Sequence, residues 1–354
     1  MLWTHAVVQA RRCGTIKMLL RRRAIEKLTR RNFVAVLGVA AVWPLTARAQ
    51  ERVLPVIGFL SGGSPRTFAK FLRAFQKGLS EQGFVEGRNV YVEYRWAEGH
   101  FDELDALAAE LVTDGVALIA ATGGMRSALA ARNATATIPI VFVLGSDPVQ
   151  LRLAASLSRP GGNATGTTIL TTELAPKRLG LLYELDPNIR NVAILVNPAS
   201  TTADDEIEDV KVAAESTKRP QPLVLKARSI SEINAAFASA VEQQVRAFII
   251  SADPFYMAQR EQLLGLAENG RMPVIYPFRE FVDDGGLMSY GPSLAAAYYR
   301  VGVAAGRILK GAKPSDLPVE APARFEFVIN LKTAETLGLT IPPGLLAIVD
   351  DTIE

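Results

Sequence analysis

Short apolar runs alternate with amphipathic segments along the chain from Val56 onward. The runs are continuously apolar and rich in Val and Ile, as in "VIGFL", "VALIA", "IPIVFVL" and "NVAILV". Strands of parallel sheets have this pattern when helices cover both faces of the sheet. Between the runs, apolar side chains recur at helical spacing, for example at Phe68, Phe71, Leu72 and Phe75. The pattern therefore predicts an α/β fold with parallel sheets.

The predicted strands fall into two groups of five. The first group is "VIGFL", "NVYVEYRW", "VALIAATGG", "IPIVFVLGSDP" and "ATGTTIL", and the second is "NVAILVNP", "PLVLKA", "AFIISADP", "PVIYPF" and "GLMSY". Two such groups predict two doubly wound, Rossmann-like lobes. Ser64-Pro65 predicts a helix start, as an N-cap followed by proline, and Ser229 to Glu232 forms a capping box. A long helix is predicted from about Leu294 to Leu309.

An apolar stretch before the first strand, "RRNFVAVLGVAAVWPLTARAQ", has the features of an export signal. Its apolar core is about a dozen residues long, whereas a membrane-spanning helix needs about twenty. Arg30 and Arg31 precede this core, and the small residues Ala47 and Ala49 follow it, so cleavage is expected before Gln50. The arginine pair resembles the twin-arginine export motif, with the general export route as the alternative.

Removal of the predicted signal changes the net charge expected for the mature protein. The whole chain has a net charge of +3, but residues 1–49 carry ten Lys/Arg and one acidic residue. The remainder holds 29 basic and 35 acidic residues, which gives a net charge of −6. This composition gives no support for nucleic-acid binding. Cys13, the one cysteine, lies upstream of the signal, and Met18 is an alternative start, so the exported chain is expected to contain no disulfide.

Candidate ligand-binding residues follow the carboxyl ends of the predicted strands, where open α/β sheets bind their ligands. They are Ser61, Gly62, Thr122, Gly123, Asp147, Asn197, Asp253, Phe255, Tyr276 and Tyr290. Asp147 and Asp253 would supply negative charge for an ammonium group. The aromatic side chains of the set, and that of Phe278, could stack on an apolar or aromatic part of a ligand. Each residue type also has a structural interpretation. An aspartate before proline is a good N-cap, paired glycines make tight turns, and aromatic residues pack at rims.

Enzyme signatures are mostly missing from the sequence. Gly161 and Gly166 have phosphate-loop spacing, but Thr167 stands where that motif requires lysine. No dinucleotide-binding glycine motif follows the first strand, and no G-x-S-x-G elbow occurs. His100 is the one histidine after the predicted signal, so a histidine-based metal site is not expected, and we predict neither a metal nor a cofactor.

Several longer phrases resemble a known protein family. They are "IGFLSGGSP", "FLRAFQKGLSEQGFVEGRNVYVEYRWAEG", "IPIVFVLGSDPV", "SLSRPGGNATG", "NVAILVNP" and "VINLKTAETLGLTIP". Together they resemble the solute-binding components of ABC transporters, and in particular the tryptophan/tyrosine-type family with a type I periplasmic-binding fold. The resemblance runs from about Val56 to Pro343.

The resemblance implies two Rossmann-like lobes joined by a three-segment hinge, with a ligand bound between them. It places the first lobe at residues 56–169 and 288–313, and the second at residues 170–287 and 314–354. It implies that cleft positions are occupied by Ser61, Thr122, Gly123, Asp147, Asn197, Asp253 and Tyr276. Family members that take aromatic amino acids tend to have Thr-Pro-Ala-Ala after the third strand, where this sequence has Thr122-Gly123-Gly124-Met125.

The function implied by the resemblance is capture and delivery of a solute without catalysis. The expected protein is periplasmic and soluble after signal cleavage, and it is a monomer. It binds a small metabolite, such as an amino acid or a related polar or aromatic compound, and passes it to an ABC permease in the inner membrane. An enzyme on the same fold, and a ligand sensor for a membrane kinase or chemoreceptor, are the alternatives that the sequence leaves open.

Overall fold

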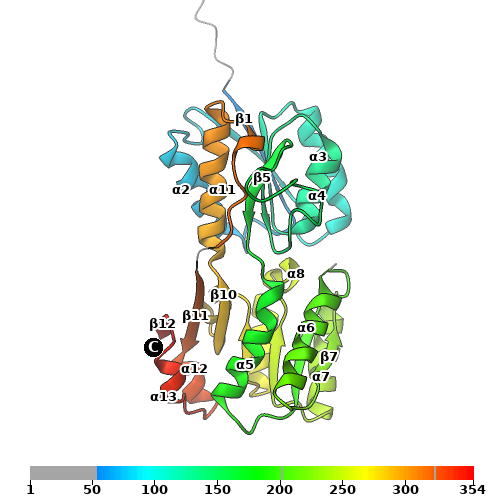
Figure 1. Ribbon diagram of the computed structural model, residues 1–354, viewed down its shortest axis with the longest axis vertical. Helices are drawn as coiled ribbons and strands as arrows, with labels where there is room; N and C mark the ends of the chain where they lie inside the picture. The colour runs from blue at the N-terminus through cyan, green and yellow to red at the C-terminus, as the bar shows by residue number, and fades with distance from the viewer. Residues whose placement is uncertain (1–53, 201, 323) are drawn as a thin grey trace, which may run out of the picture. The chain divides into compact units, whose positions relative to one another are not determined.

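The computed structural model describes residues 54–200, 202–322 and 324–354, which contain two sheets covered by helices (Figure 1). The first sheet has the strand order β2-β1-β3-β4-β5, and all its neighbouring strands are parallel. Its strands are β1 (Val56–Ser61), β2 (Tyr91–Trp96), β3 (Leu118–Thr122), β4 (Ile140–Leu144) and β5 (Ala164–Thr168). The α/β fold class and the first group of strands are confirmed. The predicted export signal lies outside the described residues.

The second sheet has seven strands in the order β12-β11-β10-β9-β8-β6-β7. The predicted strands are β6 (Val192–Val196), β7 (Leu223–Lys226), β8 (Ala247–Ile250), β9 (Val274–Tyr276) and β10 (Met288–Pro292). Two further strands, β11 (Phe325–Asn330) and β12 (Asp351–Ile353), were not predicted. β11 runs antiparallel to β10, and β12 is a three-residue edge strand beside β11. The prediction of five strands was therefore too low for this sheet.

Alternating strand residues explain how helices cover both faces of the first sheet. Phe59 packs toward α2 (Ala69–Glu81) and α11 (Leu294–Leu309), whereas Leu60 packs toward α3 (Leu104–Thr113) and α4 (Met125–Ala134). Figure 1 shows α2 beside α11. The two helices approach closely because Gly78 and Gly302 lack side chains, and a Cβ atom at either glycine would overlap a carbonyl of the other helix.

One predicted helix start was wrong. The first regular helix, α2, begins at Ala69 rather than directly after Ser64. Ser64 instead begins the turn that leads into α2, because its Oγ accepts a hydrogen bond from the Thr67 amide at 3.3 Å and its carbonyl oxygen accepts one from the Phe68 amide.

The second sheet is covered in the same way. On one face lie α5 (Ala175–Leu185), α6 (Ala203–Ser216), α12 (Leu331–Thr336) and α13 (Pro343–Leu346). On the other lie α7 (Ile230–Glu242), α9 (Arg260–Asn269) and α10 (Arg279–Asp283), with the short α8 (Pro254–Ala258) at the end of β8. The predicted N-cap at Ser229 is confirmed, since its Oγ accepts a hydrogen bond from the Glu232 amide at 3.2 Å. The reciprocal bond of the capping box is shifted by one residue, because the Glu232 carboxylate accepts from the Arg228 amide instead of the Ser229 amide.

The chain passes between the two lobes after β5, after β10 and before β11, and two of the predicted segment boundaries need correction. Met288–Pro292 was predicted in the first lobe, but it forms β10, whose backbone pairs with β9 and β11 of the second sheet. Residues 314–320 were predicted in the second lobe. A bridge between Glu320 and Thr167 instead holds this segment against β5. Within the described residues, none of the helices has the length and apolar character needed to cross a membrane.

Candidate functional site

A pocket lies at the carboxyl ends of strands from both sheets. Its empty volume is about 980 Å³, which includes open solvent at the mouth. The turns that line it include Gly123 and Gly124 after β3, Gly145 and Ser146 after β4, Asn197 after β6, and Asp253 after β8. Both lobes therefore contribute to one pocket, at the edge where parallel sheets bind ligands.

Three of the predicted site residues line this pocket: Gly123, Asn197 and Asp253. The other predicted residues do not line it: Ser61, Gly62, Thr122, Asp147, Phe255, Tyr276 and Tyr290. Phe278, the additional aromatic candidate, does line it. The pocket lies at the predicted strand ends, but most of the candidate side chains there do not point into it.

Asn197 and Asp253 form a buried polar pair on the wall of the second lobe. The Asn197 Nδ2 donates a hydrogen bond to the Asp253 Oδ1 at 3.1 Å, and the Phe255 amide donates to the same oxygen at 2.8 Å. Asp253 is 8% exposed and Asn197 is 6% exposed. Burial raises the pKa of the Asp253 carboxyl above its ordinary value, while these hydrogen bonds and the charge of Arg126 oppose that rise. Asp253 caps α8 and also faces the pocket, so both of its predicted roles fit the geometry.

Ser61 and Thr122 hold the turn beneath the pocket instead of facing the pocket itself. The Ser61 Oγ accepts a hydrogen bond from the Gly63 amide at 3.2 Å. Gly123 has a φ of +72°, and a Cβ atom there would lie 2.5 Å from the Ser61 Oγ. Its amide donates to the Tyr298 Oη at 3.0 Å. The predicted glycine turn is therefore required by the backbone, and Tyr298 of α11 supports it from the pocket side.

The aromatic pocket wall differs from the predicted one. Tyr276 is 1% exposed and stacks on Phe281 with a ring separation of 4.6 Å. Tyr290 packs against two aromatic residues of β11, and Phe255 packs against Tyr256. The wall is formed by Phe278, which was a candidate, and by Phe68, Phe101 and Tyr298, which were not. Phe68 was missed because its helical spacing resembles that of an ordinary core residue.

The remaining two predictions have structural neighbours. A Cβ atom at Gly62 would lie 2.7 Å from the Phe101 ring, so Phe101 covers this glycine. The Asp147 Oδ1 accepts a hydrogen bond from the Val149 amide at 2.8 Å, as in the predicted turn. Its neighbours Gly145 and Ser146 line the pocket in its place.

Arg126 brings a positive charge to the pocket that sequence reasoning missed. It is the second residue of α4 in the first lobe, and its side chain is exposed. The Arg126 Nη2 donates a hydrogen bond to the Ala199 carbonyl oxygen of the second lobe at 3.3 Å. Its guanidinium also lies over the Phe101 ring, 6.0 Å from the ring centre. Among the described residues, no group of three or more His, Cys, Asp or Glu side chains is placed to hold a metal ion.

A buried arginine lies behind the pocket, where the chain crosses between lobes. The Arg178 Nε donates a hydrogen bond to the Tyr290 carbonyl oxygen at 2.9 Å, and its Nη2 donates to the Thr171 carbonyl oxygen at 3.4 Å. Its Nη1 lies 3.6 Å from the Glu206 Oε1, with the two side chains 0% and 3% exposed. Burial raises the pKa of the Glu206 carboxyl, although the Arg178 charge lowers it. Arg178 thus ties α5 to β10 and to the crossover that follows β5.

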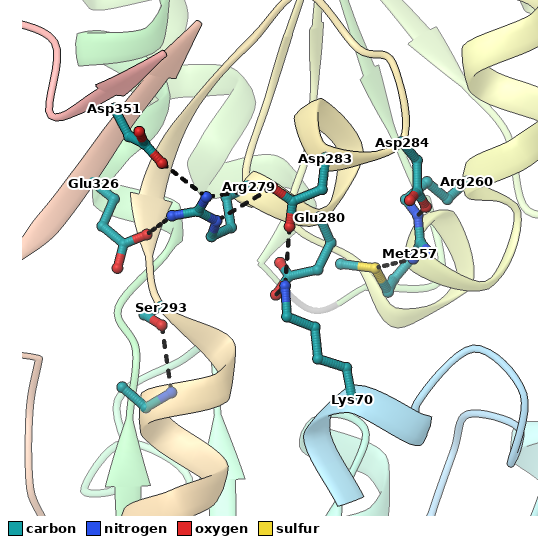
Figure 2. A network of polar contacts seen from close by, with 11 residues as sticks. Lys70, Met257, Arg260, Arg279, Glu280, Asp283, Asp284, Ser293, Glu326 and Asp351 are labelled. Atoms are coloured by element: carbon teal, nitrogen blue, oxygen red, sulfur yellow. Dashed lines mark hydrogen bonds and ion pairs between the residues drawn. The ribbon is translucent and has the colours of Figure 1, made fainter. Parts of the chain in front are cut away.

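Charged side chains also connect the lobes beside the pocket (Figure 2). Lys70 of α2 extends toward α10, where its Nζ lies 2.9 Å from the Asp283 Oδ2 and 3.8 Å from the Glu280 Oε1. Arg279 of α10 in turn contacts Asp283, Glu326 and Asp351. The α10 helix therefore carries both the contact to the first lobe and the contacts that fix it to its own sheet.

Residues 55–353 match the family model described as ABC transporter substrate binding protein. The chain belongs to this family of ABC transporter substrate-binding proteins. The family resemblance inferred from the sequence is confirmed. The family consists of substrate-binding proteins rather than enzymes.

One curated relative of this substrate-binding protein agrees with that assignment, and two solved structures share its fold. The tyrosine-binding protein of Clostridioides difficile (strain R20291) is 27% identical over 271 residues, which cover 76% of this chain and 77% of the relative. A crystal structure from Streptococcus pneumonia, described as an ABC domain in complex with L-Trp, has a TM-score of 0.75 at 24% identity and covers 85% of this chain and 100% of its own. A conserved domain protein from Vibrio cholerae O1 biovar El Tor has a TM-score of 0.77 at 24% identity, covering 84% and 99%.

Proposed function

We propose that this substrate-binding protein is exported to the periplasm, binds a small amino-acid-like solute between its lobes, and delivers it to the permease of an ABC importer. The protein acts as a monomer, needs no cofactor and makes or breaks no covalent bond. Its export signal is the segment with Arg30 and Arg31, cleaved after Ala49.

The observation that carries this proposal is the position of Asp253 in the shared pocket. A buried carboxylate facing a small-molecule pocket offers an ammonium group a charge-assisted hydrogen bond. Asn197 orients that carboxylate through the 3.1 Å hydrogen bond to its Oδ1. The nearby rings of Phe68 and Phe278 provide apolar surface for a side group.

The names of the relatives support an amino acid as the solute. One relative is a tyrosine-binding protein and another was crystallised with L-Trp. This chain differs from the aromatic-binding pattern in the turn after β3, where Gly124 has a φ of +114°. A Cβ atom at this glycine would lie 2.7 Å from Pro254 of the second lobe, so the glycine brings the two lobes close together beside the pocket.

A pocket built from two lobes also explains how binding is signalled to a permease. A solute that contacts both lobes binds the closed arrangement more tightly than the open one, and so shifts the population toward it. Hinge closure of this kind needs a few connecting segments, which the three crossovers provide. The permease then recognises the closed protein.

A thermal-shift and calorimetric screen of the purified protein against amino acids and small amines tests the function. Solute at a hundred times its dissociation constant should add about 2.7 kcal/mol to the free energy of unfolding. Asp253→Asn should abolish the shift, because it removes the charge while asparagine remains a good N-cap for α8.

The matched control is Asp147→Asn, which makes the same charge change at a residue that does not itself line the pocket. This variant should bind like the wild type. Equal binding by the Asp253→Asn variant would reject the role of this carboxylate. Chemical conversion of a bound compound would reject the proposed function as a whole.

A further inference from the structure

Arg126 and Asp253 line the pocket from different lobes. Arg126 starts from α4 in the first lobe, whereas Asp253 follows β8 in the second. Both line the same pocket, and no ion pair joins them among the contacts of the described residues. The Arg126 charge nevertheless lowers the pKa of Asp253, against the larger effect of burial. The pocket therefore contains one positive and one negative group that are close but not neutralised by direct contact.

The guanidinium is also held in a defined position. Phe101 lies beneath it at 6.0 Å, and the Ala199 carbonyl accepts one of its hydrogen bonds. A guanidinium stacked on an aromatic ring keeps its in-plane donors available for further partners. Its forked donors match the two oxygens of a carboxylate, which they bind through paired, charge-assisted hydrogen bonds.

We propose that Arg126 binds a carboxylate of the solute and restricts the pocket to carboxylate-bearing, dipolar ligands. This inference rests on the solute-binding function proposed above and names the ligand class. The carboxylate faces Arg126, the ammonium group faces Asp253, and an apolar side group packs against Phe68 and Phe278.

Arg126 also links carboxylate recognition to the contact between lobes. The same guanidinium donates to Ala199 of the second lobe, so a carboxylate held by Arg126 is held next to an interlobe hydrogen bond. Analogues of the same size with an amide in place of the carboxylate lose the negative partner of Arg126. Their binding leaves a guanidinium to be desolvated without compensation, which is a strong basis for rejection.

The test compares matched acids and amides. The probes are L-tyrosine with L-tyrosinamide, L-tryptophan with L-tryptophanamide, and L-leucine with L-leucinamide, measured by calorimetry on the full purified protein. Wild-type protein should bind at least one acid at least tenfold more tightly than its amide. Arg126→Gln should weaken binding of that acid at least tenfold and leave binding of its amide unchanged.

The control variant is Arg73→Gln, which removes the same charge from an exposed position of α2 in the same lobe, away from the pocket lining. It should keep the wild-type ratio between acid and amide. Amides that bind wild-type protein as tightly as the acids would overturn the carboxylate assignment and leave the solute-binding function standing. The same conclusion would follow if Arg126→Gln kept the wild-type ratio. A panel in which no compound binds wild-type protein would overturn both proposals.

Discussion

The Lys70 Nζ lies 2.9 Å from the Asp283 Oδ2, although the two residues belong to different lobes. Lys70 also lies 3.8 Å from Glu280, whose side chain is 7% exposed and whose pKa is raised by burial. The helix α2 belongs to the first lobe and α10 to the second, so this contact exists only while the lobes meet (Figure 2). It therefore reports directly on the arrangement in which the pocket is assembled.

We expect Lys70→Ala to weaken solute binding about two- to fivefold, since a partly exposed ion pair contributes about 0.2–1 kcal/mol. The loss arises because the assembled arrangement becomes less favourable while the pocket itself is unchanged. Calorimetry at low and high salt checks this, because screening should reduce the affinity of the wild type more than that of the variant. Lys77→Ala, an exposed change on the same helix, is the control. Equal affinities and equal salt dependence in all three proteins would contradict the prediction.

Asp253 should make solute affinity depend on pH. Its pKa is raised above 3.8 by burial, so it takes up a proton at higher pH than an ordinary aspartate. An ammonium group binds the charged form, and affinity should therefore fall as the pH falls through the raised pKa. Dissociation constants measured between neutral and mildly acidic pH should show this decline in wild-type protein. The Asp253→Asn variant should bind weakly with no such slope, and a parallel slope in that variant would assign the pH effect to another group.

Removing the buried Arg178 should destabilise the protein strongly. Arg178→Met leaves Glu206 buried without its partner, and breaking such a pair costs about 3–5 kcal/mol. Chemical denaturation measures the loss, and the double variant Arg178→Met/Glu206→Leu should recover much of it.

The pH dependence of the Arg178→Met variant has a defined sign. Burial already raises the pKa of Glu206 from 4.5 to about 7 in the presence of Arg178, and removing the cation raises it further. A raised pKa in the folded state gives stability that is present below the unfolded value and is lost as the pH rises through the folded value. The variant should therefore be more stable at pH 5 than at pH 8. If the double variant Arg178→Met/Glu206→Leu is as unstable as Arg178→Met, the unpaired Glu206 is not the cause of the stability loss.

Packing of α11 on α2 depends on glycine at their contact. Gly302→Ala should reduce the free energy of unfolding by about 1–3 kcal/mol, because its Cβ atom would overlap the Phe75 carbonyl oxygen. Gly180→Ala on α5 is the control, since nothing lies within 4 Å of a Cβ atom there. That change should be neutral or stabilise by up to about 1 kcal/mol through helix propensity. Similar denaturation midpoints for the two variants would show that the helix pair can move apart without cost.

Local sequence patterns predicted the helices and strands well, because such patterns depend only on residues that are neighbours in the chain. The ten predicted strands all form, and α11 covers Leu294–Leu309 as its spacing indicated. β11 was missed although it pairs with β10, because an antiparallel strand added to a parallel sheet has no local signature beyond a short apolar segment. The predicted boundary between the lobes at Met288 was misplaced for a related reason. Only the pairing of β10 with β9 and β11 assigns this strand to the second sheet.

The sequence by itself determined the α/β class, the strand ends where a pocket could form, and two of its polar residues, Asn197 and Asp253. These follow from periodicity and turn chemistry, which act over a few residues. Only the tertiary structure decided that Tyr276 turns into the core while Phe68 and Arg126 reach the pocket. The direction of a side chain at a strand end depends on the turn that follows and on the other lobe, and those contacts join residues far apart in the chain.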